Sequence, residues 1–333
     1  MKIQGILLII VSIILLLTPM AALSRDADGE TETAEYDLTE ENTEDAALSS
    51  AEDAGDVISV FMTVSEKTET IEMRDYVIGS VAAEMPASYE LEALKAQALV
   101  SVTFAEYMKT AESNSAPSGA DITDDSSLHQ GYISTEKMKE NWGDAFEAYY
   151  NRIVQAADAV IDKVITYDGQ PIMAAYHAIS SGQTESAANI WQSDIPYLQS
   201  VESPGDVYST RYSLTEAFSA EELKSALRSV SGVNTDDIDE NFIVINGVTE
   251  AGTVTSVTVG GKEMTGTELR SCLNLRSPCF TAEYSEGEYL ITVKGYGHGV
   301  GMSQYGADYY AKQGMTYEEI ILHYYTGVEI EGR

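Results

Sequence analysis

One glutamate has the surroundings expected of a proton donor. Glu84 lies in an apolar stretch that Pro86 interrupts, and a proline disfavours helical geometry in the residue before it. The sequence therefore predicts a short helix over residues 76–85, with Glu84 in its last turn. The negative end of the helix dipole and the apolar neighbours both raise the pKa of a carboxyl group. Such a carboxyl can protonate a glycosidic oxygen near neutral pH. The alternative is an exposed glutamate that a helix end tolerates at small cost.

A glycine-rich segment near the C-terminus offers groups that could hold a sugar. Residues 295–307 read G-Y-G-H-G-V-G-M-S-Q-Y-G-A, with four glycines ahead of a helix predicted to begin near residue 303. Glycines let a backbone approach a ligand closely or adopt positive φ. The phosphate-loop pattern G-x-x-x-x-G-K-[ST] is missing. The alternative is a tight connection to a capped helix. An imidazole, a hydroxyl, an amide and an aromatic ring come from His298, Ser303, Gln304 and Tyr305.

A second polar segment follows a predicted strand, where binding groups often gather. Residues 176–185 read Y-H-A-I-S-S-G-Q-T-E. Serine, histidine and acidic residues coincide here, but no G-x-S-x-G nucleophile motif of a serine hydrolase is present. A Cys-His protease is a weaker interpretation, since Cys272 and Cys279 have no histidine close to them in sequence. The candidate binding residues of this segment are Tyr176, His177, Ser180, Ser181, Thr184 and Glu185.

The composition excludes several kinds of partner and cofactor. The formal charge of -35 repels phosphate backbones and anionic lipids, so nucleic acid is not an expected partner. The four histidines are scattered and no C-x-x-C or H-x-x-x-H spacing occurs, so we expect no metal site and no cofactor. Cys272 and Cys279 either form a local disulfide or remain buried thiols.

The N-terminus predicts export. Residues 3–23 form an apolar run behind a single lysine, and acidic residues follow it, which places the rest of the chain outside the cell membrane. Residues 1–24 are either a single-pass membrane anchor or a cleaved signal that leaves a secreted protein. Residues 25–56 hold thirteen acidic side chains and one arginine, a composition that does not fold. This disordered acidic linker is either a spacer or a solvating tail.

The elements that must position the candidate groups lie within residues 57–330. Strands are predicted over 57–64 and 68–73, and a helix over 92–108 is apolar on most faces and should be central and buried. Asp168-Gly169 predicts a hairpin turn. We expect one large α+β domain with a buried central helix and antiparallel strands. Further strands are predicted over 242–248, 253–259, 279–284 and 289–294, and capping boxes predict helix starts at Ser219, Thr265 and Thr316.

Four motifs together resemble the stage II sporulation protein D family. They follow the family order over most of residues 57–327. The first two are Y-V-I-G-S-V-A-A-E-M-P-A-S-Y (76–89) and E-A-L-K-A-Q-A-L (92–99). The third is Y-H-A-I-S-S-G-Q-T-E (176–185) with Trp191 and P-Y-L (196–198), and the fourth is G-H-G-V-G-M-S-Q-Y-G-A (297–307) with H-Y-Y-T-G (323–327).

The resemblance implies a lytic transglycosylase that cleaves peptidoglycan between N-acetylmuramic acid and N-acetylglucosamine, on peptide-stripped strands during engulfment in sporulation. The family's catalytic glutamate falls on Glu84, and its motifs add Lys95 and Gln97 to the substrate-binding residues. One acid suffices if the sugar's own hydroxyl displaces the leaving group, whereas ordinary glycosidases use two carboxylates. The resemblance also implies a complex with a cell-wall amidase and a membrane protein. The alternative function is a non-catalytic, glycan-binding enhancer of an amidase.

Departures from the family pattern bear on the site. The usual S-G-G-x-T-E motif lacks one residue here, in S-G-Q-T-E at 181–185. Val102 stands where the family usually has arginine, so any substrate contact of that arginine is lost or supplied elsewhere. Some relatives carry a zinc-binding cluster of cysteine and histidine. No matching cluster is visible in this sequence, although His129 lies in the loop where one would be sought.

Overall fold

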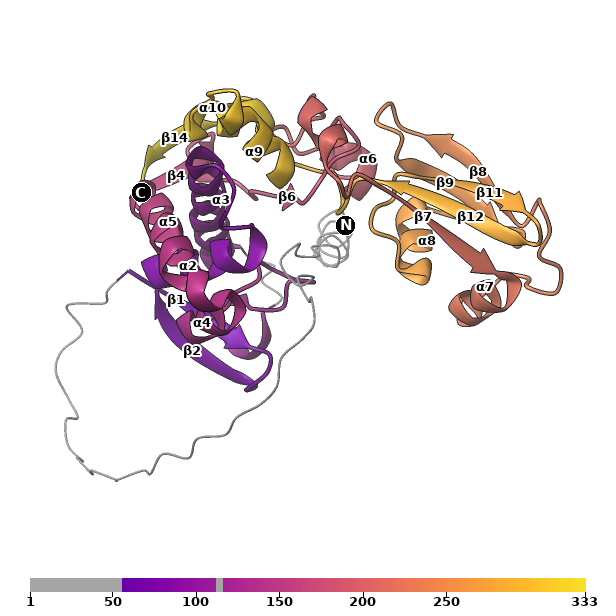
Figure 1. Ribbon diagram of the computed structural model, residues 1–333, viewed down its shortest axis with the longest axis horizontal. Helices are drawn as coiled ribbons and strands as arrows, with labels where there is room; N and C mark the ends of the chain where they lie inside the picture. Colours follow the sequence, from indigo (N-terminus) through magenta and orange to yellow (C-terminus); the bar gives the residue numbers. More distant parts are fainter. Residues whose placement is uncertain (1–55, 112–115) are drawn as a thin grey trace, which may run out of the picture.

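The computed structural model describes residues 56–111 and 116–333 (Figure 1). The predicted membrane segment, residues 1–24, lies outside these ranges, as does the predicted linker except for its last residue. Within the described ranges, no helix is both long enough and apolar enough to cross a membrane. The first strand begins at Val57, where the sequence predicts the folded part to start.

The described chain forms two bodies, each with its own hydrophobic core (Figure 1). The larger, here called the main body, is built from residues 56–212 and 295–333. Residues 213–294 form the second, here called the inserted lobe. Helices of the main body are α2 (Met73–Glu84), α3 (Leu91–Thr110), α4 (Thr135–Trp142), α5 (Phe146–Asp158), α6 (Ala187–Trp191), α9 (Gln304–Lys312) and α10 (Tyr317–Tyr324), with 3-10 turns η3 (Pro117–Gly119), η4 (Gly143–Ala145) and η5 (Pro204–Tyr208).

Helix α3 is the centre of the main body, as the sequence predicts. Thirteen of its twenty residues are buried, because apolar side chains cover most of its circumference. Helices α2, α5, α9 and α10 pack around it. Tertiary packing rather than a single amphipathic stripe therefore stabilises α3.

Short strands surround these helices. β1 and β2 pair antiparallel, while β1 with β3 and β6 with β13 pair parallel. Asp168 and Gly169 have φ of 51° and 70°, as a tight hairpin turn requires, which confirms the predicted β4–β5 hairpin. The strands are β1 (Val57–Met62), β2 (Lys67–Glu72), β3 (Ile122–Thr123), β4 (Lys163–Tyr167), β5 (Gln170–Pro171), β6 (Tyr176–His177), β13 (Met302–Ser303) and β14 (Glu329–Gly332).

The inserted lobe contains two three-stranded antiparallel sheets and two helices. The chain enters it along β7 and leaves along β12, and these two strands pair with each other. Its elements are β7 (Ser213–Ser219), α7 (Ala220–Leu227), β8 (Ile243–Val248), β9 (Val254–Val259), β10 (Lys262–Met264), α8 (Gly266–Leu273), β11 (Phe280–Ser285) and β12 (Glu288–Lys294).

The α+β class and the local helix starts agree with the sequence. Ser219, Thr265 and Thr316 each form a complete capping box at the start of α7, α8 and α10. The sequence predicts one large domain over residues 57–330, whereas the described residues form two hydrophobic cores. Strand alternation shows which side chains are buried but not which partner buries them, so the division between the bodies was not visible in the sequence.

Candidate active site

Glu84 is the last residue of α2. Met85 has extended backbone angles, φ -128° and ψ 138°, because the following Pro86 disfavours helical geometry there. The Glu84 side chain is only 3% exposed. Its Oε1 accepts a hydrogen bond of 2.5 Å from the backbone N–H of Gly131. Among the described residues, no hydrogen bond of good geometry reaches its Oε2.

Burial raises the pKa of Glu84 to about 7. The Gly131 amide opposes this rise, and so does the hydroxyl of Tyr176, because both favour the charged carboxylate. The Tyr176 hydroxyl acts on the carboxyl without reaching good hydrogen-bond geometry. The sequence also predicts a raised pKa for Glu84, and the main cause in the structure is desolvation of the carboxyl by burial. At neutral pH the carboxyl is therefore divided between its protonated and charged forms.

Gly131 is a residue that sequence reasoning missed. A Cβ atom at this position would lie 2.9 Å from Glu84 Oε1 and 3.2 Å from the Ala83 Cβ. Only glycine lets the backbone N–H come this close to the carboxyl. The contact joins residues 47 apart in the chain. A glycine in a polar loop gave no local signal of this role.

Several buried polar side chains form hydrogen bonds between α2, α3 and the loop that contains Gly131. The Ser80 hydroxyl is 3.1 Å from Gln130 Oε1 and 3.2 Å from the Ser101 hydroxyl. The Tyr76 hydroxyl donates to the same Gln130 oxygen at 3.4 Å. The charge of Glu84 is a cause, after burial, of the raised pKa of Tyr76. These residues link α2 and α3 to the loop that contains Gly131, and none of them was predicted.

The segment 176–185 does not present its side chains to one site. Tyr176 and His177 are neighbours in β6, so their side chains point to opposite sides of the strand. Tyr176 faces Glu84, whereas the His177 ring lies 5.8 Å from the ring of His298. The parallel pairing of β6 with β13 places Met302 beside Tyr176 and Ser303 beside His177.

Val300 fixes the protonation of both buried histidines. Its carbonyl lies 3.1 Å from His177 Nδ1, which must carry a proton to donate to it. Its N–H donates to His298 Nδ1 at 3.0 Å, so the proton of neutral His298 is on Nε2. Burial lowers the pKa of His177 to about 4 and that of His298 well below its usual value. The Trp191 ring packs 5.2 Å from His298. We call His177, His298 and Trp191 the histidine cluster.

Two predicted serines meet at a buried carboxylate that was not predicted. Asp206, in η5, accepts hydrogen bonds from the Ser180 hydroxyl and from the Ser180 N–H at 2.9 Å. It also accepts one from the Ser303 hydroxyl at 2.8 Å. Burial raises the pKa of Asp206 to about 6 against the effect of these donors. Ser303 in turn caps α9 by accepting from Gly306 N–H at 3.1 Å. Both serine hydroxyls are therefore committed to holding the fold.

Gln97 and Gln304 are brought together as a pair. Gln304 Nε2 donates to Gln97 Oε1 at 3.2 Å, joining α9 to α3. The Gln97 Nε2 group is buried without a partner among the described residues. Tyr305 is half-buried, and its ring meets that of Tyr89 edge to face at 6.3 Å. Tyr305 thus lies beside the turn that follows Glu84.

The remaining residues of 176–185 brace loops and the inserted lobe. Thr184 Oγ1 accepts from the Val201 N–H at 2.9 Å. The Ser181 hydroxyl donates to the Ala251 carbonyl at 2.7 Å, and the buried Glu185 accepts from the Thr249 hydroxyl. Ala251 and Thr249 belong to the inserted lobe, so this segment is part of the junction between the two bodies.

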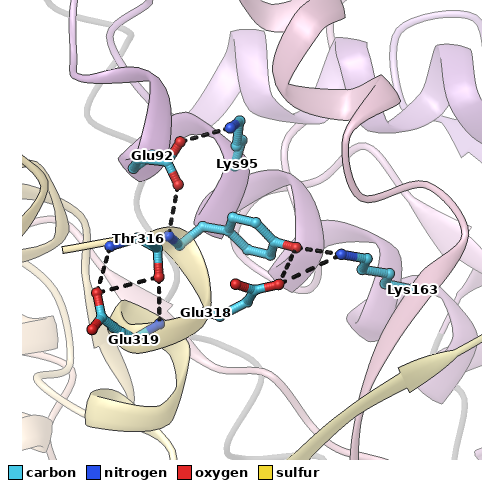
Figure 2. A network of polar contacts seen from close by, with 7 residues as sticks. Glu92, Lys95, Lys163, Thr316, Glu318 and Glu319 are labelled. Carbon is cyan, nitrogen blue, oxygen red and sulfur yellow. Dashed lines mark hydrogen bonds and ion pairs between the residues drawn. The ribbon is translucent and has the colours of Figure 1, made fainter.

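Lys95 belongs to a polar network at the start of α10 (Figure 2). It forms an ion pair of 2.6 Å with Glu92 and lies 5.8 Å from the centre of the Tyr317 ring. Glu92 also accepts from the Tyr317 N–H at 2.9 Å, and Lys163 reaches the Tyr317 hydroxyl from β4. Among the described residues, Lys95 forms no hydrogen bond or ion pair with Glu84, and its role in binding substrate stays a prediction.

The structure shows where Val102, the two cysteines and His129 lie. Val102 is fully buried in the core of the main body. Cys272 and Cys279 are free thiols, which decides between the two alternatives. Thr123 N–H donates to His129 Nδ1 at 3.0 Å. In residues 56–111 and 116–333, no group of three or more histidine, cysteine or acidic residues is placed to hold a metal ion.

The chain was compared with protein-family models and with known proteins. Residues 63–167 match the family model described as stage II sporulation protein. The chain is 39% identical over 273 residues to the stage II sporulation protein D of Bacillus amyloliquefaciens, covering 82% of this chain and 78% of that protein. The protein of the same name in Bacillus subtilis is 39% identical over 276 residues, with the same coverage of both chains.

A more distant relative has a different description. The chain is 27% identical over 304 residues to a Bacillus subtilis protein named amidase enhancer, covering 76% of this chain and 40% of that protein. The identity and coverage of the first two relatives confirm the resemblance seen in the motifs. The chain belongs to the stage II sporulation protein D family, a family of sporulation proteins.

Proposed function

We propose that this protein is a lytic transglycosylase that cleaves peptidoglycan glycan strands, with Glu84 as its acid and then its base. The observation that carries the proposal is the state of the Glu84 carboxyl. It is buried, its pKa is raised to about 7, and one of its oxygens is held by the Gly131 amide. A carboxyl poised near neutral pH can both give and take a proton.

The held oxygen indicates where the proton resides. Because Glu84 Oε1 accepts the Gly131 N–H, the protonated form carries its hydrogen on Oε2. In the first half of the reaction, Oε2–H protonates the oxygen that links N-acetylmuramic acid to N-acetylglucosamine, and the bond from that oxygen to C1 breaks. In the second half, the C6 hydroxyl of the muramic acid attacks C1, and the Glu84 carboxylate takes the hydroxyl proton. The products are an anhydro sugar end and a free hydroxyl, and no water is consumed.

The isolation of Glu84 from other charges supports this chemistry. Among the described residues, no second carboxylate influences the pKa of Glu84. Hydrolytic glycosidases use a carboxylate pair, with the second group acting as nucleophile or activating water. A reaction in which the substrate supplies its own hydroxyl needs only the one acid.

The proposal includes a location and partners. Residues 3–23 predict an exported protein, so the substrate would be met outside the cell membrane, on peptide-stripped strands during engulfment. An amidase removes the peptides from such strands, and the distant relative named amidase enhancer supports an association with an amidase. A membrane protein of the same machinery would complete the complex.

The test uses purified full-length protein and peptide-stripped glycan strands, with mass spectrometry of the products. Anhydro-ended fragments are expected, and Glu84→Gln should slow their release by about 10²- to 10⁴-fold. Glu283→Gln, at an exposed glutamate of β11, is the matched control and should retain the parental rate. Equal rates for the Glu84→Gln and parental proteins would refute the assignment. If neither protein cleaves strands and both stimulate an amidase equally, the chain is an enhancer instead.

A further inference from the structure

Four tyrosines form a line on the main body beside the turn that follows Glu84. The Tyr208 side chain is 71% exposed, and its ring stacks with that of Tyr309 at 6.1 Å. Tyr305 and Tyr309 are one turn apart on α9, so they lie on the same side of the helix. Tyr305 then meets Tyr89 at 6.3 Å. We call Tyr89, Tyr305, Tyr309 and Tyr208 the tyrosine track.

One end of the track lies in the turn that follows Glu84 in the chain. Tyr89 lies five residues after Glu84 in the chain. Arg152 fixes this turn by donating to the carbonyls of Ala87 at 3.0 Å and Tyr89 at 2.5 Å. The Tyr305 N–H donates to the Ala178 carbonyl at 3.1 Å, two residues beyond the tyrosine that faces Glu84. The track therefore leads away from the Glu84 turn along α9.

Arg211 lies near the tyrosine track. It lies three residues beyond Tyr208, and its N–H donates to the Ser209 hydroxyl at 3.2 Å. Its guanidinium is close enough to Tyr89 to oppose the burial that raises the pKa of that tyrosine. The side chain is half-buried and forms no ion pair or hydrogen bond with any described residue. A guanidinium without an ion pair, next to an aromatic surface, points to an anionic ligand.

Two carboxylates that act on Tyr89 together with Arg211 already have partners. Asp206 accepts hydrogen bonds from two buried serine hydroxyls. Asp308 pairs with Lys312 and accepts the Glu90 N–H at 2.7 Å. Neither forms an ion pair with Arg211, so the guanidinium keeps its planar set of donors for a carboxylate from outside the chain.

We propose that the tyrosine track and Arg211 bind an acidic glycan strand, with sugar rings against the tyrosines and a carboxylate of the strand on Arg211. This inference rests on the proposed function and assigns residues to its preference for peptide-stripped strands. An N-acetylmuramic acid residue bears a lactyl carboxylate when it carries no peptide, and an amide when a peptide is attached. An arginine that binds the free carboxylate therefore selects strands from which the peptides have been removed. The aromatic faces supply contact area that does not depend on this charge.

The test compares two forms of one ligand. Peptide-stripped glycan strands are used as they are, or after their lactyl carboxylates have been converted to methyl amides. Binding is measured by calorimetry with full-length protein carrying Glu84→Gln, so that cleavage does not interfere. The free-carboxylate strand should bind about ten-fold more tightly, as a charge-assisted hydrogen bond implies. Adding Arg211→Gln should remove this preference, and raising the salt concentration should weaken it.

A matched variant separates a local effect from a change in overall charge. Arg228→Gln removes an exposed arginine at the end of α7 in the inserted lobe, and it should keep the ten-fold preference. Tyr208→Ala should weaken binding of both strand forms by a similar factor, because stacking is indifferent to the carboxylate.

Three results would overturn the inference. They are equal binding of the two strand forms, a preference that survives Arg211→Gln, and unchanged binding after Tyr208→Ala. Failure of the proposed function is a separate result. If parental protein released no anhydro products while its Glu84→Gln form still preferred carboxylate strands, the binding site would stand and the reaction would not.

Discussion

The Glu84 carboxyl and the histidine cluster are both buried and lie on either side of the same short strand, β6, but burial has opposite consequences for them. It raises the pKa of Glu84 to about 7 and lowers that of His177 to about 4. In each case the charged form is disfavoured. For the carboxyl this produces a group that gives and takes protons near pH 7. For the histidines it produces rings that stay neutral at that pH.

The sequence predicts one site that contains both Glu84 and the two histidines. The structure places them on opposite sides of β6, where they can have different roles. The histidine rings are tied by their Nδ1 atoms to Val300, which holds residues 298–300 against β6. In the proposed reaction Glu84 transfers the proton, and we expect the histidine cluster to position residues 298–300. Four measurements test whether the carboxyl and the histidines differ in this way.

The largest expected effect is a change in how stability depends on pH. The pKa of Glu84 is above its unfolded value of 4.5, so the stability it contributes is present below pH 4.5 and lost as pH rises through about 7. Glu84→Gln removes that loss. Between pH 4.5 and pH 8, the free energy of unfolding of the variant should therefore rise relative to that of the parental protein by of order 3 kcal/mol.

Urea denaturation at both pH values measures this difference. The histidine cluster has the opposite sign, since a lowered histidine pKa makes stability fall as pH drops from 6.5 toward 4. A constant difference between variant and parent across pH would show that Glu84 titrates like a free glutamate.

Gly131→Ala should impair catalysis by about 100-fold. The added Cβ would lie 2.9 Å from Glu84 Oε1 and displace the carboxyl, and a misplacement of about 1 Å can cost this much. The rate of strand cleavage at saturating substrate is the measurement. Gly332→Ala is the control, because its Cβ would meet no atom within 4 Å. A fully active Gly131→Ala protein would remove the Gly131 contact from the mechanism.

His298→Leu should reduce stability rather than catalysis. The change leaves the buried Val300 N–H without its acceptor, at a cost of about 1 to 3 kcal/mol. Denaturation at pH 7 measures the loss, and the cleavage rate per folded molecule should change little. His323→Leu, at a half-buried ring of α10, is the comparison and should cost less. A large fall in the rate without loss of stability would support the substrate-binding role that the sequence predicts for His298.

Tyr176→Phe should have the smallest effect. The Tyr176 hydroxyl favours the charged form of Glu84, so its removal should raise the pKa of the carboxyl further, by less than about one unit. The alkaline limb of the rate-against-pH profile should move upward by the same amount. A shift in the other direction would mean that the hydroxyl stabilises the protonated form.

Features carried by short stretches of sequence were predictable. The end of α2 at Glu84 follows from the next two residues, the burial of α3 from its apolar circumference, and three helix starts from their capping boxes. The family, too, was readable from motifs that are each contiguous in the chain. These features depend on neighbours within a few residues, and the sequence lists those neighbours directly.

Contacts between distant segments were not predictable. Gly131 reaches Glu84 across 47 residues, and Ser303 reaches Asp206 across 97. The separation of Tyr176 from His177, the commitment of Ser180 and Ser303 to Asp206, and the division into two cores all depend on which segments pack together. Burial and pKa are set by that packing, because they measure what surrounds a group in space. The motif around Glu84 was therefore enough to propose it as the acid, but the burial that raises its pKa to about 7 follows from packing between distant segments.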